Sequence, residues 1–125
     1  MVSPSLLTRC IETAFTLVDL PDGKAKHFAW LLHNNTVIGF GWNKHRSHPY
    51  QVRWGYRDRP YAIHAEAAAV LSTRKTGDEM IVVRVNRLGE VRLSKPCVCC
   101  YSFLQHYGVR RVWFTTNTSW ERMEL

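Results

Sequence analysis

The sequence predicts an α/β protein, a single α/β/α sandwich with a central mixed sheet. Three observations support this fold class. The chain has 125 residues, which fits one compact domain, and 46% of them are apolar, which is enough to bury a core. Segments with apolar residues at helical spacing alternate with short apolar runs typical of strands. This alternation favours one sheet with helices on its faces, and we expect residues 1–125 to form one domain.

The first predicted element is a helix that begins at Ser3 and Pro4. A serine hydroxyl caps the first turn of a helix, and proline fits the first helical position. Apolar residues, Cys10 among them, then recur at helical spacing as far as Val18, so one face of this helix is expected to be buried. The turn formers at 21–23 end it.

The remaining elements follow from the same two periodicities and from turn residues. Asn34 and Asn35 favour a tight turn between the first two strands, because asparagine tolerates positive φ. Gly77 and Gly108 follow the ends of the two later helices. The predicted elements are strands at 26–32 and 36–42, a helix at 65–73, strands at 80–87 and 90–93, a helix at 97–107, a strand at 110–115 and a short helix at 119–125.

The segment 43–63 has no periodicity and carries +4 of the formal net charge of +7. Four aromatic residues interleave with its five basic residues, which are Lys44, Arg46, Arg53, Arg57 and Arg59. Arg57 and Arg59 are candidate substrate-binding residues in a lid that grips a phosphate group. The alternatives for this segment are a platform that stacks single-stranded bases, a solvated loop and an oligomer contact.

Charge and cysteine usage restrict the partners and the compartment. A net charge of +7 favours an anionic partner, such as a phosphate, a nucleotide or a nucleic acid. We expect no targeting signal and no membrane segment, since no apolar run approaches the roughly 18 residues that a spanning helix needs.

Cys97, Cys99 and Cys100 lie too close together for a disulfide framework. They are interpreted as thiols in a reducing compartment, and we expect a cytoplasmic protein.

Two short fragments carry the residues from which chemistry is expected, and each follows a loop and begins a helix. Cys97 and Cys100 are three residues apart, so a helix places them on one face, where both can bind one ion. The helix N-terminus lowers the pKa of a thiol and favours the thiolate. His64 can supply a third ligand, which leaves one tetrahedral position open, as in catalytic zinc sites. Glu66, two residues from His64, is then placed to move protons to and from a water on the metal.

These fragments read HAE at 64–66 and PCVCC at 96–100. They resemble the signature of the zinc-dependent deaminases of nucleosides, nucleotides and nucleobases, H-x-E followed by P-C-x-x-C. The resemblance is to the cytidine and deoxycytidylate deaminases, and in particular to small enzymes of the phage type. It implies a cytidine deaminase-like fold, Zn²⁺ held by His64, Cys97 and Cys100, and Glu66 as the proton shuttle.

The resemblance also implies a substrate-binding role for Asn43 and Ala65. Asn43 stands where many members place a sugar-binding asparagine, and its alternative role is to cap the end of a strand. A structural zinc site is disfavoured, because no second ligand pair is spaced to close it. The implied reaction is hydrolytic deamination of a cytosine nucleotide or nucleoside, with dCMP, which would give dUMP and ammonia, as the leading substrate.

Two other functions stay open from the sequence. The first is deamination of a polynucleotide, either single-stranded DNA or tRNA. The tRNA branch is disfavoured because Tyr101 and Ser102 stand where a small Gly-Ala pair is usual. The second is a non-catalytic, zinc-stabilised nucleic-acid-binding module, which would not need Glu66. The resemblance further implies a homo-oligomer, located in the host cytoplasm if the protein is viral.

Overall fold

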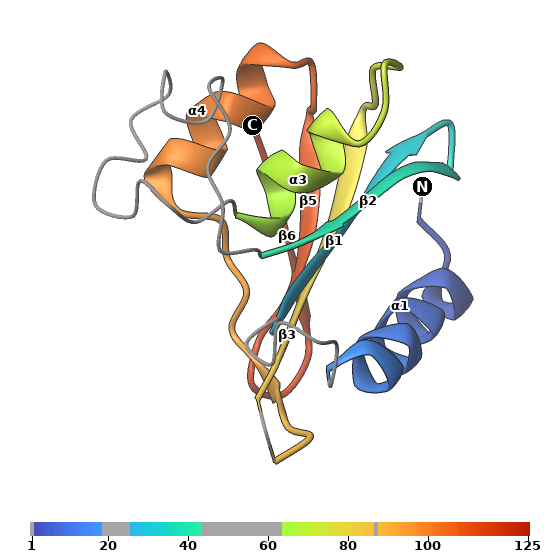
Figure 1. Ribbon diagram of the computed structural model, residues 1–125, viewed down its shortest axis with the longest axis vertical. Coiled ribbons are helices and arrows are strands. Elements are labelled where there is room, and N and C mark those ends of the chain that lie inside the picture. Colours follow the sequence, from blue (N-terminus) through green and yellow to red (C-terminus); the bar gives the residue numbers. More distant parts are fainter. Residues whose placement is uncertain (1, 19–25, 44–63, 87) are drawn as a thin grey trace.

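The computed structural model describes residues 2–18, 26–43, 64–86 and 88–125, and Figure 1 shows their arrangement. No helix among these residues is long and apolar enough to cross a membrane. Their elements are α1 (Pro4–Leu17), β1 (His27–His33), β2 (Thr36–Trp42), α3 (Ala65–Leu71), β3 (Glu79–Val85), β4 (Val91–Arg92), α4 (Val98–His106), β5 (Arg111–Thr115) and β6 (Trp120–Glu124).

The strands form one six-stranded mixed sheet in the order β2-β1-β3-β5-β6, with β4 paired to β3. β3 and β5 are parallel, and the other neighbours are antiparallel. Helices α3 and α4 cover one face, where they bury a cluster that includes Met80 and Phe103. Helix α1 covers the other face over Ile81 and Val83. The predicted α/β/α sandwich with a mixed central sheet is therefore confirmed.

The first helix and the first hairpin form for the reasons expected from the sequence. Ser3 caps α1, because its hydroxyl accepts a hydrogen bond from the Leu6 amide at 3.2 Å, and Pro4 occupies the first turn. Cys10 faces the core and is 3% exposed. Asn34 and Asn35 join β1 to β2 with φ of 48° and 65°, the left-handed conformation that asparagine tolerates.

Helix α3 lies unusually close to strand β2, and this close contact determines where the helix begins relative to the sheet. A Cβ atom on Gly41 would lie 2.4 Å from the Ala69 nitrogen, so only glycine fits at this position. The facing residues of α3 are alanines, which keep the helix flat against the sheet. Small residues on both elements therefore determine where His64, the N-cap residue of α3, lies relative to the sheet.

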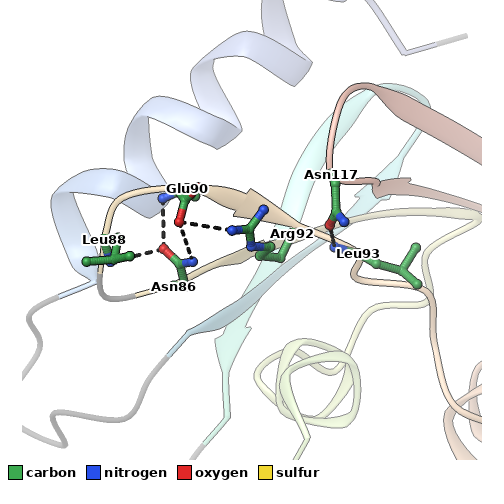
Figure 2. Close-up of polar contacts among 6 residues, drawn as sticks. All are labelled: Asn86, Leu88, Glu90, Arg92, Leu93 and Asn117. Atoms are coloured by element: carbon green, nitrogen blue, oxygen red, sulfur yellow. Dashed lines mark hydrogen bonds and ion pairs between the residues drawn. The ribbon is translucent and has the colours of Figure 1, made fainter.

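Side-chain hydrogen bonds hold the turn between β3 and β4. Figure 2 shows the Asn86 oxygen accepting from the Leu88 amide at 3.0 Å and the Glu90 amide at 2.9 Å. Glu90 in turn forms an ion pair of 2.9 Å with Arg92. These side-chain bonds add to the backbone bonds from the Asn86 amide to the Glu90 carbonyl and from the Gly89 amide to the Asn86 carbonyl, and together they close the turn.

The short helix expected at 119–125 is wrong, because this segment is strand β6. Thr116 makes the preceding turn, where its hydroxyl oxygen accepts from the Ser119 amide at 2.9 Å. β6 then pairs with β5, and Glu124 accepts from the Arg111 guanidinium at 2.9 Å. Pairing of this segment satisfies the backbone groups at the edge of β5, which a helix here would leave unpaired. The other described elements agree with the prediction within one or two residues at each end.

Candidate active site

The three predicted metal ligands meet where the first residues of α3 and α4 lie together on one face of the sheet. His64 is the N-cap residue of α3, Cys97 is the N-cap residue of α4, and Cys100 lies in its first turn. The Nδ1 atom of His64 is 3.7 Å from the Cys97 sulfur and 3.4 Å from the Cys100 sulfur. All three ligand atoms lie within 4.8 Å of one another. His64 thus forms one cluster with two cysteines that lie 33 and 36 positions later in the sequence.

These distances fit a zinc ion without rearrangement. Zn–N bonds of about 2.0–2.1 Å and Zn–S bonds of about 2.3 Å place nitrogen and sulfur about 3.6 Å apart in a tetrahedral site. The two nitrogen–sulfur distances of 3.4 and 3.7 Å bracket that value. One imidazole and two thiols also form a donor set that zinc prefers, and they leave the fourth position for a water or a substrate.

The Cys97 sulfur is prepared for metal binding by its neighbours. The Cys100 side chain donates a hydrogen bond to it, and His64 and the Cys100 amide, at 3.4 Å, add to the effect. These contacts lower the pKa of Cys97 to about 4, despite the opposing effect of burial. The thiolate, which is the form that binds a metal, is therefore present at neutral pH in the zinc-free protein. Burial instead raises the pKa of Cys10 to about 12, so Cys10 stays a thiol.

This difference predicts selective alkylation of the zinc-free protein. Iodoacetamide is expected to modify Cys97 at pH 6, because this pH lies above its pKa of about 4, while Cys10 stays unmodified. Cys97 also binds fewer protons in the folded than in the unfolded chain, so its stabilising effect grows as pH rises from about 4 toward 9 and is lost as pH falls through about 4.

Peptide mapping by mass spectrometry measures both sites in one sample. Added zinc should protect Cys97, which would identify it as a ligand. Modification of Cys97 only above about pH 8, the range of an ordinary thiol, would contradict the lowered pKa.

Glu66 lies beside the ligand cluster, in the first turn of α3. It is 6% exposed, and its neighbour Ala65 is 1% exposed. Burial raises the pKa of the Glu66 carboxyl, although a hydrogen bond from its own backbone amide and the nearby His64 act in the opposite direction. A raised pKa makes the carboxyl a better proton acceptor than an ordinary glutamate, which suits a group that must take up a proton and return it.

Of the predicted substrate-binding residues, Ala65 lies between His64 and Glu66, whereas the Asn43 side chain binds to the start of β1. The Asn43 side-chain oxygen accepts hydrogen bonds from the Lys26 and His27 amides, both at 3.0 Å. Asn43 therefore caps the start of β1 from the end of β2, which is the alternative role considered from the sequence. Arg57 and Arg59 lie outside the described residues, as does all of the basic segment after Asn43.

Sequence reasoning missed two residues behind the cysteine ligands. Ser94 and Thr115 are 2% and 0% exposed, and their hydroxyl oxygens lie 2.8 Å apart. Ser94 was noted only as part of the Ser94–Cys97 run that resembles small phage deaminases, and neither residue belongs to the H-x-E or P-C-x-x-C fragment. Only the tertiary fold, which places β5 beside the segment after β4, shows that the two hydroxyls meet.

Comparison with known proteins gives one family and several solved structures. The model of the cytidine and deoxycytidylate deaminase zinc-binding region matches residues 4–116. A search of curated proteins gives no match. The dCMP deaminase of cyanophage S-TIM5 in its apo form is 20% identical, with a TM-score of 0.60 over 92% of this chain and 86% of that one.

Two cytidine deaminases of known structure are also similar to this chain. That of Burkholderia pseudomallei is 16% identical, with a TM-score of 0.65 over 98% of this chain and 93% of that one. That of Mycobacterium tuberculosis is 17% identical, with a TM-score of 0.58 over 98% of this chain and 91% of that one. At these identities the structures establish a shared fold, and the match to the family model covers most of the chain.

Proposed function

Because the chain belongs to the family of cytidine and deoxycytidylate deaminases, which are zinc-dependent hydrolases, we propose that it deaminates a cytosine nucleotide, with dCMP as the leading substrate. One observation carries the proposal. His64, Cys97 and Cys100 converge within 4.8 Å, and the buried Glu66 lies beside them in the first turn of α3. A site that only stabilised the fold would need the three ligands but not the carboxylate.

The side chains divide the chemistry between holding the ion and moving protons. His64, Cys97 and Cys100 would hold Zn²⁺, which would supply a Lewis acid that lowers the pKa of a water molecule. As the attacking water forms its bond to the amine-bearing ring carbon, Glu66 takes one proton from the water and delivers it to the adjacent ring nitrogen. Glu66 then carries the second proton to the amine. Ammonia leaves, and the oxygen becomes the carbonyl of uracil.

A phosphorylated substrate is supported by charge and by a structural relative. The chain carries a net charge of +7, and more than half of it lies in the segment 43–63. Arg57 and Arg59 offer planar donor groups that match a phosphate. The S-TIM5 dCMP deaminase, solved in complex with dCMP and dUMP, has a TM-score of 0.60 with this chain.

Replacing Arg57 and Arg59 together by alanine tests this choice of substrate. Hydrogen bonds to charged groups contribute about 1.5–3 kcal/mol, so kcat/KM for dCMP should fall about tenfold or more, while that for deoxycytidine changes little. The matched control is Arg9→Ala with Arg74→Ala, which removes the same charge from exposed positions on α1 and after α3. An equal loss on dCMP and deoxycytidine would show that the two arginines do not bind the phosphate.

Deamination of the free nucleoside is the second candidate. It is supported by the Burkholderia cytidine deaminase, whose TM-score of 0.65 over 98% of this chain exceeds that of the phage enzyme. Steady-state rates with dCMP, deoxycytidine and cytidine distinguish the two candidates. A preference for dCMP supports the first, and equal or higher kcat/KM for a nucleoside supports the second. The predicted homo-oligomer and the nucleic-acid alternative stay predictions.

A further inference from the structure

A buried pair of hydroxyl groups lies behind the segment that leads to the cysteine ligands. The Ser94 hydroxyl donates to the Val82 carbonyl at 2.9 Å and accepts from the Thr115 amide at 2.8 Å. The Thr115 hydroxyl oxygen lies 2.7 Å from the Arg92 carbonyl oxygen and 2.8 Å from the Ser94 hydroxyl oxygen, and its single proton is donated to one of these two acceptors. Ser94 and Thr115 thus join β3, the end of β4 and β5 at one point.

These bonds continue the sheet where its ladder stops. The pairing of β4 ends at Arg92. Beyond it, the Leu93 amide donates to the Asn117 side chain at 3.1 Å, as Figure 2 shows, and the Ser94 amide donates to the Thr115 carbonyl at 2.9 Å. Among the described residues, Ser94 is the last before Cys97 that is hydrogen-bonded to a neighbouring element.

The first turn of α4 is held against the core by Cys100, which is fully buried, and the chain from Ser94 enters this turn through Cys97. Phe103 and Leu104, which hold α4 on the sheet, are fully buried but lie in its second half. Val98, the first residue of α4, is 81% exposed, and the Cys97 side chain before it is exposed as well. The place of Cys97 relative to His64 therefore depends on the chain that arrives from Ser94, together with the buried Pro96 before it and the buried Cys100 after it.

We propose that Ser94 and Thr115 are positioning residues for the metal centre, whose paired hydroxyls hold the Ser94–Pro96 segment so that Cys97 and Cys100 meet His64 at ligand distance. They act through the cysteines and touch neither metal nor substrate. Metal sites tolerate displacements of only about half an ångström, and loss of outer contacts typically costs about 10–100-fold in metal affinity. The inference rests on the zinc site of the proposed function.

Two pairs of variants test the proposal. Ser94→Ala and Thr115→Val each remove one hydroxyl, and valine keeps the shape of threonine. Thr115→Ser keeps the hydroxyl and removes only a methyl group. Ser102→Ala removes an exposed hydroxyl from α4 that donates only to the Val98 carbonyl of the preceding turn. Zinc affinity is measured by competition with a chelator, and ligand geometry by the absorption spectrum of the Co²⁺-substituted protein.

Ser94→Ala and Thr115→Val are expected to bind zinc about 10–100-fold more weakly and to change the Co²⁺ spectrum. Thr115→Ser and Ser102→Ala should keep the wild-type affinity and spectrum. A merely structural role would lower the thermal midpoints of the zinc-free and zinc-loaded forms equally, whereas the positioning role shrinks the difference between them. If Ser94→Ala does not fold, the comparison of zinc affinity between Thr115→Val and Thr115→Ser tests the proposal.

The outcomes separate this inference from the proposed function. If the wild type does not bind one zinc ion per chain, the zinc-dependent function itself is contradicted. If the wild type binds zinc and the two hydroxyl-free variants bind it equally tightly with an unchanged Co²⁺ spectrum, the positioning role alone is overturned.

Discussion

Glu66→Gln is expected to abolish deamination and to leave the fold and the zinc content unchanged. Glutamine has the shape of glutamate but cannot accept the proton of the water, and Glu66 is the residue assigned to both proton transfers. General acid–base catalysis contributes about 10²–10⁴-fold, so a loss near the upper end is expected. The ligand cluster does not include the carboxylate, and its three atoms should still converge.

Three measurements on the same preparation check this expectation: product formation by mass spectrometry, zinc by atomic absorption and thermal unfolding. Glu121→Gln, on the exposed part of β6, is the matched control and should retain full activity. Turnover of Glu66→Gln within tenfold of the wild type, with zinc bound, would assign the proton shuttle to another group.

The second large effect is expected from Cys100→Ser, which should lose zinc and the stability that zinc confers. Cys100 is fully buried, and its sulfur lies 3.4 Å from the His64 ring nitrogen. A ligand that binds only the folded state stabilises it by about 4 kcal/mol at a thousand times its Kd. The variant should therefore unfold at the temperature of chelator-treated wild type, and a chelator should not lower its midpoint further.

Cys99 provides the matched control for this experiment. It lies between the two ligands in the sequence, is half-buried and is not part of the ligand cluster. Cys99→Ser should keep one zinc ion per chain and most of the stability. Retention of zinc by Cys100→Ser, or its loss from Cys99→Ser, would refute the assignment of the ligands.

Local sequence signals predicted the elements that form from local causes. Ser3 with Pro4 marked the start of α1, and Asn34 with Asn35 marked the first hairpin, because capping and positive φ are properties of single residues. The ligands were recognisable for the same reason. Helical spacing puts Cys97 and Cys100 on one face, and both fragments open a helix.

What could not be predicted depends on contacts between distant segments. The segment 119–125 has no strong period of its own, and it becomes β6 because the edge of β5 is there to pair with. Ser94 and Thr115 acquire their role only when β5 lies beside the end of β4. Asn43 was a candidate both for substrate binding and for capping a strand end, and only the paired strands show that its side chain accepts from the Lys26 and His27 amides.

The central claim, a Glu66-dependent deamination of cytosine in a small substrate, is tested most directly by one substrate panel. Zinc-loaded wild type and Glu66→Gln are incubated side by side with dCMP, dCTP, deoxycytidine, cytidine, cytosine, single-stranded DNA and tRNA, and products are identified by mass spectrometry. The account predicts conversion of dCMP to dUMP by the wild type only, with dCMP the fastest substrate. Conversion of polymer alone, or no conversion of any cytosine substrate by protein carrying one zinc ion per chain, would contradict it.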